Sequence, residues 1–181
     1  MRTEYLVITI LLVFVGNIEA QTALETAPVG TMAKIMRGVY FPNSNILFDV
    51  QMQDPGAPPE EAAADGTVSS TFSSIYTGWE VVENAALVLA EGASLINKPG
   101  RICQNGRMAP VQRWDWLKYS GAMTDVAWDI YLAASERNQE VVSELTNNLA
   151  EACDACHRVY RSNSQSGNMR CLGPGVIIEQ Q

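Results

Sequence analysis

The stretch Asn138-Gln-Glu-Val-Val-Ser-Glu-Leu-Thr-Asn-Asn-Leu-Ala-Glu-Ala-Cys-Asp-Ala-Cys-His157 contains the only histidine of the chain and has a clear helical period. Asn138 can accept a hydrogen bond from a free N–H at a helix start, and Glu140 suits the positive first turn. Apolar side chains then recur every three or four residues, as on one helix face: Val142, Leu145, Leu149, Cys153, Cys156 and Tyr160. The pattern predicts a helix over residues 139–162.

Three further segments show the same period. Apolar spacing predicts helices over residues 29–41, 72–97 and 111–137. We expect Pro42 to end the first helix, because the residue before a proline is pushed out of the α region. We expect Pro110 to open the third, because its missing N–H has no partner there. With a long polar link over residues 51–70 and no run of strands, the chain is predicted to be all-α, a four-helix bundle.

The helix expected over residues 111–137 has a narrow polar stripe and carries its large apolar side chains elsewhere. The remaining residues include three of the four tryptophans of the chain, so we expect this helix to be buried over most of its girth. The polar stripe consists of Asp115, Lys118, Asp125, Asp129 and Glu136.

The charge of the chain argues against nucleic-acid binding, and its first 20 residues indicate export. The 181 residues hold 12 Lys and Arg against 20 Asp and Glu, a net charge of −8. Nucleic-acid binding depends on a basic surface that releases counterions, so it is not expected. Residues 1–20 have the layout of a secretory signal peptide, with Arg2, an apolar run over 6–16 and Ala20 at the cleavage point. That run is too short for a membrane anchor, so we expect one exported domain over residues 21–181, in the periplasm and without a membrane span.

Cys153-Asp-Ala-Cys156-His157 is the attachment signature of c-type haem. At helix positions i, i+3 and i+4 the three side chains leave one face. Two thiols can there add to the two vinyl groups of one porphyrin, while the imidazole of His157 binds the iron. Three other readings compete: a thioredoxin-like dithiol, a zinc site completed by Cys103 and Cys171, and a disulfide within the motif. The first lacks its strands, and the second leaves no role for His157.

With this motif near the C-terminus, on the last of four helices, the chain resembles the class II c-type cytochromes, the cytochrome c-prime type of four-helix bundle. The resemblance covers residues 29–162, and the stretch from Cys153 to Arg161 is its sharpest part. It implies one covalent haem c on the C-terminal helix, with His157 as the proximal iron ligand and Arg161 close to the haem propionates.

The same resemblance implies that a residue of the first helix faces the other side of the iron. Met36 and Met32 lie four apart on that helix, and Met36 aligns best with the ligand position, with Met32 in reserve. Core packing is the alternative role for both methionines. If an apolar residue such as Ile35 faces the iron instead, the site is five-coordinate and open to small gases.

We therefore expect a one-electron carrier and not an enzyme, with gas binding of NO or CO as the alternative and a subunit of a larger exported complex as a third possibility. The acidic net charge suggests redox partners with a basic docking patch, and family members often form homodimers. Cys103 and Cys171 remain after haem attachment, and in an oxidising compartment they are expected to form a disulfide, with two buried free thiols as the alternative.

Overall fold

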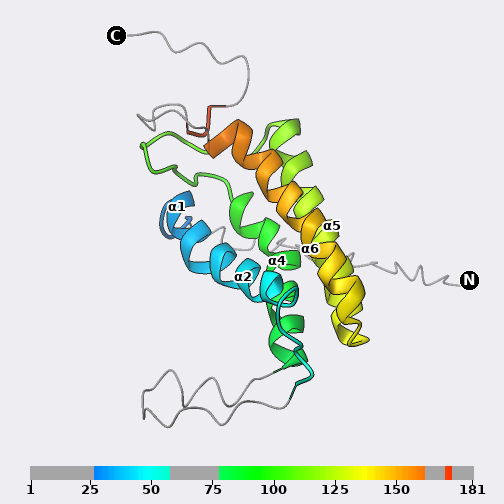
Figure 1. Cartoon of the computed structure of the whole chain (residues 1–181). Coiled ribbons are helices and arrows are strands. Elements are labelled where there is room, and N and C mark those ends of the chain that lie inside the picture. The colour runs from blue at the N-terminus through cyan, green and yellow to red at the C-terminus, as the bar shows by residue number, and fades with distance from the viewer. Residues whose placement is uncertain (1–26, 58–77, 162–169, 173–181) are drawn as a thin grey trace, which may run out of the picture.

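The computed structural model describes residues 27–57, 78–161 and 170–172, and its described residues are mostly helical (Figure 1). An N-terminal helical segment and the helices α4 (Trp79–Ile96), α5 (Trp114–Ser135) and α6 (Gln139–Cys156) pack against each other. Among these residues the only β pairing is an isolated bridge between Ile102 and Met108. The expected signal peptide, residues 1–20, lies outside the described part. The all-helical class predicted from the apolar spacing is confirmed.

The N-terminal helical segment does not end at Pro42 as predicted. It runs continuously through α1 (Met32–Ile35), the π-helical turn η1 (Met36–Tyr40) and α2 (Phe41–Asp49). Within the wide turn the N–H of Phe41 donates to the carbonyl of Met36, five residues back. Pro42 follows directly after this turn, as the second residue of α2. The side chain of Asn43 donates to the Val39 carbonyl at 2.7 Å, so that carbonyl keeps a partner beside the proline.

The second long helix is shorter than predicted. It was expected to begin at residue 72, but α4 begins at Trp79, after Gly78 at a φ of 64°. Residues 58–77 lie outside the described part of the chain. A side chain at position 78 would be strained in this conformation, and its Cβ would lie 2.7 Å from the carbonyl oxygen of Pro55. Position 78, directly before α4, therefore requires glycine.

The last two helices also differ from the prediction at their ends. α5 begins at Trp114, not near Pro110, which instead accepts the N–H of Arg113 in a turn. Asn138 caps α6 as predicted, because its side chain accepts the N–H of Val141 at 3.2 Å. α6 continues into the π-helical turn η2 (His157–Arg161) and so ends close to the predicted boundary.

One core joins all four helical segments. Its fully buried side chains include Leu47 of α2, Leu89 of α4, Ile130 of α5 and Leu149 of α6. Burying a side chain of this size stabilises the fold by about 1.5–3 kcal/mol. No helix within the described ranges is long and apolar enough to cross a membrane.

α5 is less buried than predicted. Trp114 is 73% exposed and Trp128 48% exposed, and Leu117 and Leu132 are exposed with them. The predicted polar stripe also loses a member, because Asp115 is buried and paired with Arg113. The prediction failed because α4 and α6, the helices that pack against α5, leave one apolar strip of α5 uncovered.

The disulfide expected between Cys103 and Cys171 is present, with 6.5 Å between the two Cα atoms. It joins the loop between α4 and α5 to residues 170–172. The same short segment is held by the N–H of Cys171, which donates to the Tyr160 carbonyl at 2.9 Å. Asn105 adds a bond from its side chain to the Arg170 carbonyl at 3.0 Å. Residues 170–172 are therefore fixed beside the end of η2.

Candidate cofactor-binding site

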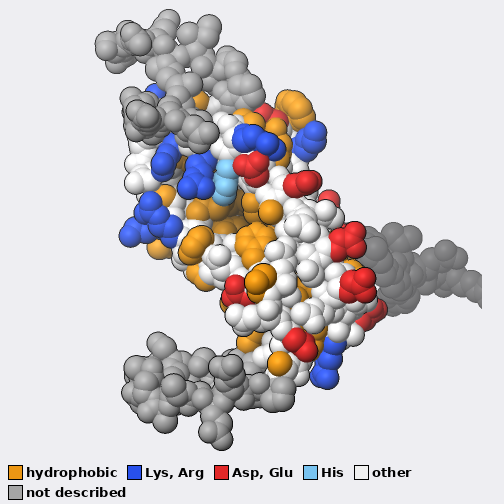
Figure 2. Space-filling view, in the orientation of Figure 1, with side chains coloured by type: hydrophobic (Ala, Val, Ile, Leu, Met, Phe, Trp, Pro, Cys, Tyr) orange, Lys and Arg blue, Asp and Glu red, His pale blue; other side chains and the backbone are white. Residues whose placement is uncertain are grey.

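A cavity of about 400 Å³ lies at the end of the molecule where α1 begins and η2 ends. This volume falls in the range of small-molecule and cofactor sites. All four helical segments line the cavity, and so does the disulfide. In Figure 2 the hollow faces the viewer, with orange apolar side chains inside it and the pale blue histidine at its edge. Six of the residues that the motif and the resemblance single out line it: Cys153, Cys156, His157, Arg161, Met36 and Met32. Ile35, the apolar alternative to the two methionines, is not among the lining residues.

The two cysteines of the motif are free thiols on one wall of the cavity. Burial raises the pKa of Cys153, and burial followed by the neighbouring Cys153 and Asp115 raises the pKa of Cys156 to about 11. Dithiols that attack disulfides have lowered pKa values and lie at helix N-termini, whereas these two lie in the last turn of α6. The arrangement disfavours a thioredoxin-like role.

His157 follows the thiols at the first position of η2 and is partly buried. Burial lowers the pKa of its imidazole first, and the guanidinium of Arg161 lowers it further, against the opposite effect of Asp154. Both lowering causes favour the neutral ring. A neutral imidazole has the lone pair that a metal ion requires.

The methionines line the cavity from the N-terminal helical segment. Met32, in the first turn of α1, is 7% exposed, and Met36, the first residue of the π-helical turn, is partly buried. Tyr40, the last residue of this π-helical turn, is buried, and its hydroxyl donates to the Gly92 carbonyl of α4. This hydrogen bond holds the turn against α4. Single π turns inside helices are frequent at functional sites.

Three arginines lie at the cavity edge, and only Arg161 was predicted from the sequence. Arg37 and Arg170 line the cavity together with Arg161. Arg170 donates to the side chain of Gln104 at 2.7 Å, while its buried Nε has no hydrogen-bond partner in the described part of the chain. Arg170 carried no local sequence signal, because the disulfide brings it to the cavity from outside the helices.

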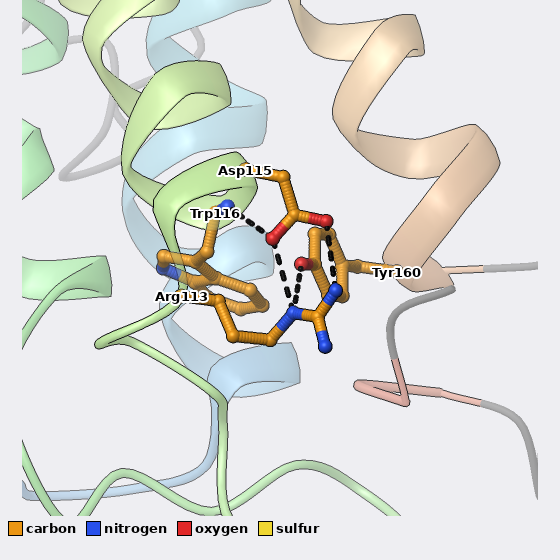
Figure 3. Close-up of polar contacts among 4 residues, drawn as sticks. All are labelled: Arg113, Asp115, Trp116 and Tyr160. Carbon is orange, nitrogen blue, oxygen red and sulfur yellow. Dashed lines mark hydrogen bonds and ion pairs between the residues drawn. The ribbon is translucent and has the colours of Figure 1, made fainter. Parts of the chain in front are cut away.

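A polar cluster surrounds the hydroxyl of Tyr160, whose residue lines the cavity (Figure 3). The guanidinium of Arg113 donates to both carboxylate oxygens of Asp115, at 3.0 and 3.1 Å, and to the Tyr160 hydroxyl at 3.3 Å. The N–H of Trp116 donates to the same carboxylate at 3.1 Å. Hydrogen bonds from Arg113 are the main cause that lowers the pKa of Asp115 to about 2. The cluster joins the start of α5 to η2.

The zinc alternative loses two of its four ligands, because Cys103 and Cys171 form the disulfide. Within the described residues no group of three or more His, Cys, Asp or Glu side chains could hold a metal ion. Comparisons of the chain with protein-family models, curated proteins and solved structures gave no match.

Proposed function

We propose that the protein is a monohaem c-type cytochrome of the class II kind, which acts as an exported one-electron carrier. One observation carries the proposal: two thiols, an imidazole and two thioether side chains, singled out from the sequence, line a single cavity. A bound haem iron supplies one-electron redox chemistry without reaction at a substrate. The signal-like residues 1–20 make export part of the proposal.

The residues of the cavity match the needs of such a group. Cys153 and Cys156 would each add their S–H across a vinyl group, a step that needs no oxidant. His157 of η2 would bind the iron, and Met36 of η1 would be the second protein ligand. A Met ligand and an apolar pocket both raise the reduction potential.

The arginines also fit a ligand with two carboxylates at its edge. Arg161, Arg37 and Arg170 offer guanidinium groups, which bind carboxylates with two parallel hydrogen bonds. The unpartnered Nε of Arg170 would gain an acceptor there. A buried donor without a partner costs about 1–3 kcal/mol, so occupancy of the site would remove this penalty.

Absorption spectra of the ferric, ferrous and CO-treated ferrous protein test this proposal. We expect low-spin spectra with the far-red band of a Met ligand, unchanged by CO. Met36→Leu removes the thioether at nearly constant volume, so the band should disappear and CO should bind. Met32→Leu is the matched control and should retain the wild-type spectra. A wild-type protein that is high-spin and binds CO would instead be a gas-binding protein.

A further inference from the structure

Positive charge is concentrated at the cavity end of the molecule, although the chain as a whole is acidic. We define the cavity end as residues 27–48, 89–123, 150–161 and 170–172, the parts of each element that surround the cavity. Ten of the 11 Lys and Arg residues that the structure describes lie there: Lys34, Arg37, Lys98, Arg101, Arg107, Arg113, Lys118, Arg158, Arg161 and Arg170. Only four acidic residues accompany them: Glu91, Asp115, Glu151 and Asp154.

The far end, residues 49–57, 78–88 and 124–149, has the opposite charge. Its only basic residue among those described is Arg137, against nine acidic ones: Asp49, Asp54, Glu80, Glu83, Asp125, Asp129, Glu136, Glu140 and Glu144. Figure 2 shows this separation on the visible face, with blue side chains grouped around the hollow and red ones mostly below it and to its right.

This separation persists when the cofactor is included. Two haem carboxylates would offset two of the six excess positive charges at the cavity end. Arg101 is buried, and Arg113 and Arg158 pair with Asp115 at 3.0 Å and Asp154 at 3.1 Å. Seven other basic residues then remain at this end, against the acidic Glu91 and Glu151. At physiological ionic strength the Debye length is about 8 Å. A partner at the cavity edge therefore meets the positive residues, while the acidic far end is screened.

We propose that the redox partner docks at the cavity end through an acidic surface patch. The proposal rests on the cytochrome function above, because that end is where a haem would come closest to a partner. It differs from the basic patch that the net charge alone suggests. Complementary charge at the docking face accelerates encounter, and this acceleration falls as salt is added.

Ferricyanide, a trivalent anion, serves as a stand-in for an acidic partner. We expect its rate constant for oxidising the ferrous protein to fall at least about threefold between 10 and 500 mM salt, and that of the cation tris(phenanthroline)cobalt(III) to rise. The double variant Lys34→Glu/Arg107→Glu changes two exposed residues that do not line the cavity. It should weaken the salt effect with ferricyanide, whereas Arg137→Glu at the far end should not.

A second readout does not need haem. At pH 7 and low salt the wild type and Arg137→Glu should bind a sulfopropyl resin despite the net charge of −8, and the double variant should elute earlier. A ferricyanide rate that rises with salt, or equal behaviour of the two variants, would overturn the proposal. Retention on phosphatidylserine vesicles at 0.1 M salt would overturn it in favour of a membrane surface. Lack of a haem spectrum would contradict the cytochrome function alone, since the resin still reports the charge separation.

Discussion

The ring of Tyr160 packs edge-on against that of Trp116, with centroids 4.7 Å apart and ring planes at 69°. Tyr160 lies three residues after His157, and Trp116 lies in the first turn of α5. Both residues are 4% exposed and line the cavity. The contact therefore fixes the end of the helix that carries the cysteines and the histidine.

Truncating Tyr160 should lower the free energy of unfolding much more than removing its hydroxyl alone. Loss of a buried aromatic ring costs about 3–5 kcal/mol, so Tyr160→Ala should lower the free energy of unfolding by that amount. Tyr160→Phe keeps the ring contact and loses one hydrogen bond to Arg113, so about 1 kcal/mol is expected. Urea unfolding followed by circular dichroism measures both. Equal losses would show that the ring contact contributes nothing.

Gly92→Ala should destabilise the fold, because a Cβ at this position would lie 2.8 Å from the Tyr40 hydroxyl. That hydroxyl would have to leave the Gly92 carbonyl, and overpacking of this kind costs about 1–3 kcal/mol. Gly121→Ala in α5 is the matched control, since nothing lies within 4 Å of its Cβ. The control should gain up to about 1 kcal/mol from helix propensity. If both variants are stabilised, Tyr40 does not hold the π-helical turn against α4.

Removing the disulfide should lower stability without preventing cofactor attachment. The bridge joins residues 68 positions apart, for which the chain-entropy relation gives about 4 kcal/mol. Cys103→Ser/Cys171→Ser should lose stability of this order in urea unfolding, while Cys153 and Cys156 keep their thiols for haem. A loss below about 1 kcal/mol would contradict a stabilising role for the bridge.

Asp115 should make stability depend on pH in the acid range. Hydrogen bonds from Arg113 lower its folded-state pKa from 3.8 to about 2, so between these values the unfolded chain binds the proton first. The contribution of Asp115 to the free energy of unfolding is therefore fully present above about pH 4 and is lost as pH falls toward 2. Asp115→Asn should flatten this decline in urea unfolding at a series of pH values. Asp125→Asn, which alters an exposed carboxyl of the same helix, should retain it.

The sequence was most informative for α6, because this one helix holds the cap, the apolar period and the Cys-x-x-Cys-His motif. The apolar period of α6 and its cap at Asn138 predicted both its start and the common face of Cys153, Cys156 and His157. The continuation past Pro42 could not be read locally, because it depends on a π-helical turn stabilised by Tyr40 against α4. The burial of Asp115 likewise depends on contacts with Arg113 and η2.

Residues brought to the site by tertiary contacts were missed. Arg170 lies at the cavity because the bridge from Cys171 to Cys103 and two hydrogen bonds hold its segment there, and no spacing along the chain indicates this. The charge separation was also hidden, because a net charge does not show which ends of antiparallel helices come together. Both features require the fold before they can be seen.

The mass of the intact protein, produced in an exporting host with haem c maturation, tests the central claim most directly. We predict an increase of one haem that persists after denaturation and is lost in Cys153→Ser/Cys156→Ser. Cys103→Ser/Cys171→Ser, the control, should keep the added haem. A folded wild-type protein with the mass of the bare chain would contradict the account.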